Sequence, residues 1–163
     1  KEAVMFRPHQ DIVTAAQAGK VAACVAECLQ LRRGTKGGRL RYVPVVTPGQ
    51  LAAIEHARRV APCENDSLSD PRYQLARAIR HQRYVMELFG LTKAMLGVTA
   101  HGLRHGYAAE RYKAETGMAP PVATAERADA AVDLAARRLV SEALGHSRTQ
   151  ITSMYLGSSR ARR

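Results

Sequence analysis

Hydrophobic and polar residues alternate in two short segments near the start of the chain. Residues 28–32 read Cys-Leu-Gln-Leu-Arg, and residues 40–46 alternate in the half that precedes Pro44. Gly-Thr-Lys-Gly-Gly, residues 34–38, separates them, and glycine readily adopts the positive φ angles of tight hairpin turns. The pattern predicts an antiparallel β-hairpin with Lys36 at its tip.

Capping signals divide much of the remaining chain into helices. Thr47 can cap a helix that starts at Pro48 and runs to about Val60, and Gln50 completes a capping box. Ser147 and Gln150 repeat this arrangement near the end of the chain. Other predicted segments are a helix from Asp70-Pro71 to Gly90, one from His101 to Gly117, one from Thr124 to about Leu144, and a short last helix from Ser147 to a stop at Gly157.

Two segments at the start of the chain are less regular. Residues 1–6 read as the inside of a helix with no cap before it, which is expected of a fragment of a longer protein. Residues 11–24 are rich in alanine and fit either a helix or a loop. The pattern as a whole predicts one α+β domain over residues 1–163, mainly helical with a small antiparallel hairpin or sheet.

The charge of the chain indicates a polyanionic partner. The net charge is +11 and the sequence pI is about 10.2, which favours nucleic-acid binding, although solubility alone remains an alternative. Basic residues are spread along the chain and are denser in residues 32–41 and 160–163. This spread suits a surface that lies on duplex DNA better than one disordered basic arm.

Several classes of protein are disfavoured. No apolar run approaches the roughly 20 residues of a membrane span, and residues 7–9 (Arg-Pro-His) interrupt any signal-peptide pattern. Cys24, Cys28 and Cys63 form no CxxC pair, so neither a disulfide framework nor a zinc module is predicted. A cytoplasmic location is expected.

Five residues suggest phosphodiester chemistry: Lys36, His101, Arg104, His146 and Tyr155. A phenol, with a pKa of about 10, is a weak nucleophile that needs a proton acceptor or a strong positive potential. A guanidinium stabilises the charge that develops on phosphoryl oxygens, because its planar fork donates two hydrogen bonds. A lysine or histidine can protonate the departing sugar oxygen. No metal or other cofactor is required.

The spacing of these residues is compatible with one site. His101 and Arg104 are three residues apart and share a helix face. Tyr155 follows His146 by nine residues, and nine residues of straight helix would place the two on opposite sides. His146 is therefore expected to precede the last helix.

Three motifs in this order resemble those of the tyrosine recombinases, the family that includes phage and integrative-element integrases. Residues 144–146 (Leu-Gly-His) with Tyr155 resemble its Leu-Gly-His…Tyr box, and residues 101–105 resemble its His-x-x-Arg box. Residues 35–44 resemble the hairpin that carries its catalytic lysine. The resemblance implies the catalytic fold of that family and site-specific DNA recombination or integration.

The resemblance also implies a role for each residue. Tyr155 would attack the scissile phosphate and form a 3′-phosphotyrosyl link, while Arg104 and His146 would hold the phosphoryl oxygens. Lys36 would protonate the departing 5′ oxygen, and His101 would help to move the tyrosine proton.

Further expectations concern the surroundings of the site. His105 is expected to be a packing residue, and Arg39 and Arg41 are expected to face DNA phosphates beside Lys36. The implied partners are double-stranded DNA and further copies of the chain, as a tetramer on DNA.

The chain departs from the family pattern at three places. If Glu2 belongs to the family's Arg-x-x-Glu motif, its arginine lies before Lys1, and the fragment is expected to be inactive alone. Arg104 and His146 are 42 residues apart, so extra residues are expected between residues 112 and 130. Few residues follow Tyr155.

Two other classes of function remain open, and two are disfavoured. A type IB topoisomerase-like enzyme would use the same chemistry to relax one duplex, and a non-catalytic DNA-binding relic would lack the first arginine. Metal hydrolysis is disfavoured because the Glu of an HExxH motif is missing. A histidine phosphatase needs a strand before Arg104-His105-Gly106, and residues 96–100 make only a weak strand.

Overall fold

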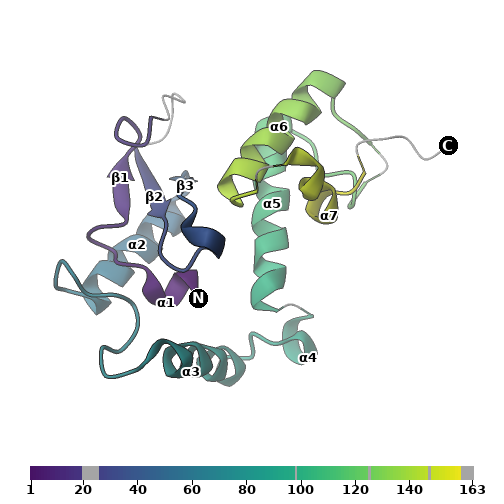
Figure 1. The fold of residues 1–163 in the computed structure, drawn as a ribbon. Coiled ribbons are helices and arrows are strands. Elements are labelled where there is room, and N and C mark those ends of the chain that lie inside the picture. Colours follow the sequence, from purple (N-terminus) through teal and green to yellow (C-terminus); the bar gives the residue numbers. More distant parts are fainter. Residues whose placement is uncertain (20–25, 98, 125, 147, 159–163) are drawn as a thin grey trace. The chain divides into compact units, whose positions relative to one another are not determined.

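The computed structural model describes residues 1–19, 26–97, 99–124, 126–146 and 148–158 (Figure 1). The chain divides into two compact units, Lys1–Val85 and Met86–Arg163. Helices predominate, with one three-stranded antiparallel sheet, so the α+β prediction is confirmed at that level. In the described ranges no helix has the length and apolar character needed to cross a membrane.

The first unit holds the sheet and the helices around it. Its elements are α1 (Glu2–Met5), β1 (Ile12–Thr14), β2 (Glu27–Leu31), the 3-10 turn η1 (Lys36–Gly38), β3 (Arg41–Val45), α2 (Pro48–Val60) and most of α3 (Leu75–Leu88). The second unit contains helices and no strand in its described part. Its elements are α4 (Lys93–Leu96), α5 (Ala100–Thr116), α6 (Ala130–Ala143), the 3-10 turn η2 (Thr149–Thr152) and α7 (Ser153–Leu156).

The predicted hairpin is present as β2 and β3, with Lys36 in the connecting turn. Leu29 pairs with Val43, and Pro44 lies opposite Cys28. Because β3 is an edge strand, proline at position 44 costs no interior ladder bond. The sequence did not predict β1, which pairs with the other side of β2, because three residues are too few to show an alternation.

Two helices have the predicted termini. The Thr47 side chain accepts a hydrogen bond from the Gln50 backbone at 3.2 Å, and the Gln50 side chain accepts one from the Thr47 backbone at 3.1 Å. These two bonds form the predicted capping box of α2. Helix α5 ends as expected at Gly117, whose φ of 72° is left-handed.

Two other predicted boundaries were wrong. Asp70 does not open α3, because its carboxylate accepts from the Arg72 backbone at 2.9 Å and forms a turn instead. Helix α6 starts after Asp129, which caps it, and not at residue 124. No strand lies over the described residues 96, 97, 99 and 100: Leu96 ends α4, and Thr99 caps α5.

Some predictions fall on residues that are not described. These are the cap at Ser147, the thiol of Cys24, and the basic tail from residue 160 to residue 163.

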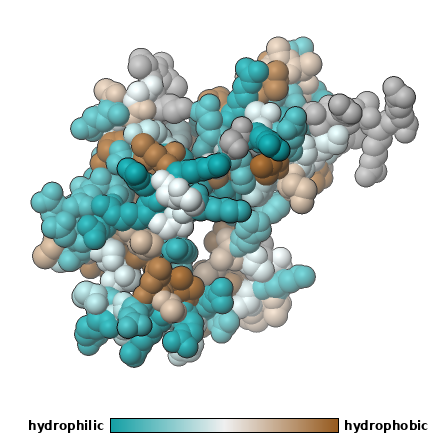
Figure 2. All heavy atoms as spheres, viewed as in Figure 1, coloured by the Kyte–Doolittle hydropathy of each residue, from teal (hydrophilic) through white to brown (hydrophobic). Residues whose placement is uncertain are grey.

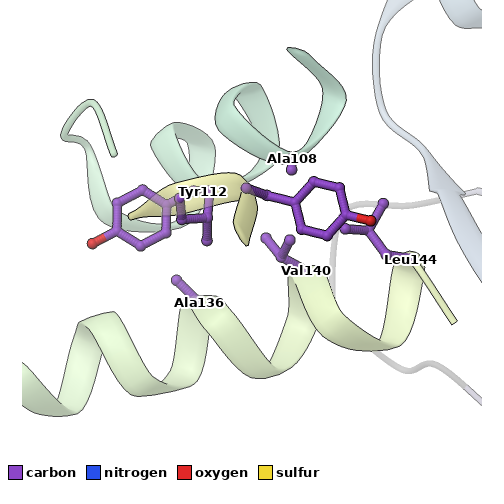
Figure 3. Close-up of a cluster of buried hydrophobic side chains, with 7 residues drawn as sticks. Ala108, Tyr112, Ala136, Val140 and Leu144 are labelled. Atoms are coloured by element: carbon purple, nitrogen blue, oxygen red, sulfur yellow. The ribbon is translucent and has the colours of Figure 1, made fainter. Parts of the chain in front are cut away.

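A small apolar core joins α5, α6 and α7. Figure 3 shows Ala108 and Tyr112 on one helix facing Ala136, Val140 and Leu144 on the other. The alanines allow the two helices to approach closely while the larger side chains fill the space between them. Tyr155 and Leu156 of α7 complete the cluster. The last helix is thus ordered by packing on α5 and α6.

A buried polar network ties the same three helices together. The hydroxyl of Tyr112 donates to Asp133 at 2.6 Å, and Arg137 Nε donates to the other oxygen of that carboxylate at 2.8 Å. Arg137 also donates to the backbone oxygen of Gly157 at 3.0 Å. Burial, together with the bond to Asp133, raises the pKa of Tyr112 to about 12.

This network predicts a loss of stability at high pH. Between pH 10 and 12 the Tyr112 phenol stays protonated in the folded chain but ionises in the unfolded chain, so the free energy of unfolding decreases as pH rises. Tyr112→Phe should lower the free energy of unfolding by about 1–3 kcal/mol at pH 7. Urea denaturation should show the difference between wild type and variant shrinking from pH 10 to 12. A difference that stays constant over this range would contradict the assignment.

Candidate active site

The N-terminal turns of α5 present three of the side chains of interest. The hydroxyl of Thr99 accepts a hydrogen bond from the Gly102 backbone at 3.1 Å and so fixes the start of the helix. His101 and His105 then stack edge to face, with ring centroids 5.4 Å apart. Arg104 lies between them in sequence and is partly buried.

The Leu-Gly-His segment is the C-terminal cap of α6. Gly145 has a φ of 74° and donates to the Glu142 carbonyl at 2.9 Å, while the His146 backbone donates to the Ser141 carbonyl at 2.8 Å. These two bonds define a Schellman motif, in which glycine is favoured because its φ is positive. The motif therefore has a physical reason for its glycine and sets the direction in which His146 leaves the helix.

Ser141 holds the backbone of His146 from both sides. The His146 backbone N–H donates to the Ser141 carbonyl, and the Ser141 hydroxyl donates to the backbone oxygen of His146 at 3.1 Å. Ser141 is only 3 % exposed, so this clamp is shielded from water. Ser141 positions His146, and the sequence reasoning did not single it out.

His146 lies beside the tyrosine. Its Nε2 is 3.3 Å from the hydroxyl oxygen of Tyr155, and the ring centroids are 5.7 Å apart. The expectation that His146 precedes the last helix is confirmed, because it lies in the turn between α6 and η2. This placement brings together two residues that a continuous helix would separate.

Two further imidazoles surround the same phenol ring. The centroid of His105 is 4.6 Å from that of Tyr155, and the centroid of His101 is 6.4 Å away. His105, expected only to pack, is thus closer to the ring than His101. Tyr155 itself is 9 % exposed.

Arg104 crosses from α5 to the end of α6. Its Nη2 donates to the backbone oxygen of Leu144, where the carbonyl ends of the helix carry partial negative charge. Its Nε is buried and has no hydrogen-bond partner among the described residues. A buried guanidinium N–H in this state is a donor that an incoming anion could satisfy.

The backbone after Tyr155 is fixed on two sides. Leu156 accepts a hydrogen bond from the Val122 backbone at 2.9 Å, and Gly157 accepts one from Arg137 at 3.0 Å. Gly157 has a φ of 83°, and a β-carbon there would lie 2.9 Å from the Val122 nitrogen. The predicted stop at Gly157 is confirmed, and only glycine fits it without strain.

The basic residues of the hairpin belong to the first unit. Lys36 and Arg39 are exposed on the turn and just after it. Arg41 is different, because its side chain is only 10 % exposed and forms an ion pair with Glu2. The structure thus pairs Arg41 with a carboxylate inside its unit, and a contact of Arg39 or Arg41 with DNA phosphates stays a prediction.

The cap of α6 gives a testable stability effect. Gly145→Ala should lower the free energy of unfolding by about 1–2 kcal/mol, because an L-residue is strained in the left-handed region. Gly106→Ala is the matched control: it lies inside α5 with no atom near an added β-carbon and should stabilise the chain slightly. Urea denaturation of both variants measures the contrast. Equal effects would contradict the assigned cap.

Comparison of the chain with family models, with curated proteins and with solved structures found no match.

Proposed function

We propose that the second unit carries a metal-independent phosphodiester-cleaving site in which Tyr155 is the nucleophile. The observation that carries the proposal is the 3.3 Å separation of His146 Nε2 and the Tyr155 hydroxyl. Arg104 supports it, since it is held at Leu144, two residues before His146. Within this class, we propose the catalytic domain of a tyrosine recombinase, as the resemblance of the three motifs implies.

The chemistry assigns a task to each group. The phenolic oxygen of Tyr155 attacks phosphorus, and its proton passes to a neighbouring imidazole such as His146 or His101. Arg104 and His146 stabilise the charge that develops on the non-bridging oxygens. The bond to the 5′ oxygen breaks, and that oxygen takes a proton, for which Lys36 of the first unit is the proposed donor.

The product conserves the energy of the broken bond. A phosphotyrosyl diester replaces a DNA phosphodiester, so a 5′ hydroxyl of another strand can attack it and release Tyr155 without ATP. The proposed reaction is therefore site-specific DNA recombination or integration. Double-stranded DNA is the proposed partner, in keeping with a net charge of +11, and a tetramer in the cytoplasm is the proposed assembly.

The test is the capture of a covalent intermediate. Because the resemblance places an arginine before Lys1, the protein is extended at that end. It is mixed with a pool of duplexes of randomised sequence that carry a nick in one strand. Cleavage beside the nick releases a short fragment, so religation is prevented and the adduct accumulates.

The readout distinguishes the proposed function from its alternatives. We expect a denaturation-resistant protein–DNA adduct, with mass spectrometry placing the nucleotide on the peptide that contains Tyr155. Transfer of the strand to a second duplex would support recombination over relaxation of one duplex. Absence of any adduct from the extended protein over the whole pool would overturn the proposal.

A further inference from the structure

The solvent-facing side of α3 and the turn before it carry interleaved aromatic and basic residues. We name this set the α3 stripe, and its members line a shallow hollow of about 480 Å³: Tyr73, Arg77, Arg80, His81 and Tyr84. Four of them, at positions 73, 77, 81 and 84, follow the spacing of one helix face. Hydrophilic side chains cover α3 along the lower edge of Figure 2.

The rings of the stripe form a connected row. The Arg77 guanidinium lies 4.3 Å above the centroid of Tyr73. The His81 ring meets Tyr73 edge to face at 5.6 Å and lies 6.3 Å from Tyr84 at a tilt of 31°. Tyr84, at the end of the row, is 59 % exposed. An aromatic face is thus open to solvent at the end of a row of rings.

The charge of the stripe is positive. None of its members is acidic, and Arg77, Arg80 and the adjacent Arg83 form no ion pair with any described residue. Ala78 is the single buried residue within the described helix α3. Packing in the core therefore does not explain the aromatic side chains of the α3 stripe. A helix whose face only contacts water would have polar side chains at these positions.

We infer that the α3 stripe binds unpaired nucleotides of a nucleic-acid strand. Arginines bind the phosphates, while Tyr84 and His81 offer faces on which bases stack. Duplex DNA does not expose base faces, so the aromatic part of the stripe selects single strands over duplex. The inference does not rest on the proposed cleavage chemistry, because all five residues lie in the first unit.

Binding of labelled oligonucleotides tests this inference. Fluorescence anisotropy compares a single-stranded 12-mer of mixed sequence with a duplex of the same sequence, at low salt. Tyr84→Ala should weaken single-strand binding about tenfold or more and change duplex binding less than about twofold. Tyr84→Phe keeps the ring and should bind as wild type does.

Two controls make the outcome decisive. Phe89→Ala removes another aromatic side chain, 74 % exposed and just beyond α3, and should leave both affinities unchanged. The chain has no tryptophan and six tyrosines, so quenching of tyrosine fluorescence by the single strand should diminish in Tyr84→Ala. Circular dichroism checks that each variant is folded.

The contrary results are equally specific. Equal weakening of single-strand and duplex binding in Tyr84→Ala, or no weakening of either, would overturn the inference. Displacement of the single strand by poly-glutamate of the same length and concentration would also overturn it, because the stripe would then be a general surface for acidic polymers.

Discussion

Tyr155→Phe should abolish the covalent protein–DNA adduct, lowering the rate of its formation by a factor of about 10⁴ or more. The substitution removes one oxygen, the atom that His146 Nε2 approaches to 3.3 Å. The ring would stay in the cluster with Val140 and Leu144, so the free energy of unfolding should change by less than about 1 kcal/mol. The measurement is single-turnover adduct formation on nicked duplexes.

A neighbouring tyrosine provides the control for this prediction. Tyr107 packs against the same cluster and is partly buried, and Tyr107→Phe also removes a single oxygen. The Tyr107→Phe variant should form the covalent protein–DNA adduct at the wild-type rate. An undiminished adduct in Tyr155→Phe would show that another group is the nucleophile.

Arg104→Gln should reduce the rate of adduct formation by about 10²–10³ at saturating DNA. The loss arises because a neutral amide cannot stabilise charge on the phosphoryl oxygens as the guanidinium does. Arg104→Lys should recover part of the rate, since the charge remains but the planar fork is lost. Equilibrium binding to DNA should change far less than the rate does.

A structural role of Arg104 must be separated from a chemical one. The bond to Leu144 means that the variant should also lose some stability, so the rate is measured well below its melting temperature. Arg111→Gln is the matched control: this arginine lies on the same helix and pairs with Glu115 at 2.6 Å. Wild-type rates for Arg104→Gln would remove Arg104 from the proposed site.

Local signals explain which parts of the fold the sequence could predict. Thr47, Pro48 and Gln50 specify the start of α2 through contacts within four residues, and Gly117 and Gly157 specify helix ends through their φ angles. Such signals act between neighbours in the sequence, so they can be recognised without knowledge of tertiary structure.

Competing local chemistry explains the wrong boundaries. Asp70 resembles a helix cap but its carboxylate closes a turn on Arg72, five residues before α3 begins. The cap of α6 is Asp129, five residues after the predicted start at Thr124, because the Asp129 side chain accepts from the backbone of Ala131 and Val132. Strand β1 depends on pairing with β2, which its own three residues do not encode.

For the candidate site too, the sequence predicted some features and not others. The position of His146 before the last helix followed from helical geometry and was confirmed. The clamp by Ser141 spans five residues but matches no capping pattern that was recognised, while the approach of His105 to Tyr155 depends on tertiary packing, which local patterns do not indicate. The pairing of Arg41 with Glu2 joins residues 39 positions apart, and such a pair is invisible to local patterns.

The short helix that carries Tyr155 has a consequence for how the protein would lose activity. Four residues, Ser153–Leu156, cannot form a stable helix by themselves, because the first turn is entropically unfavourable. Helix α7 is therefore stabilised by α5 and α6 through the apolar cluster and the Arg137–Gly157 bond, and by Val122 of the segment between them, which donates to Leu156. Partial opening of the α5–α6 pair would release Tyr155 before the rest of the unit unfolds. Heat or denaturant should therefore abolish the proposed adduct formation while most of the helical structure persists.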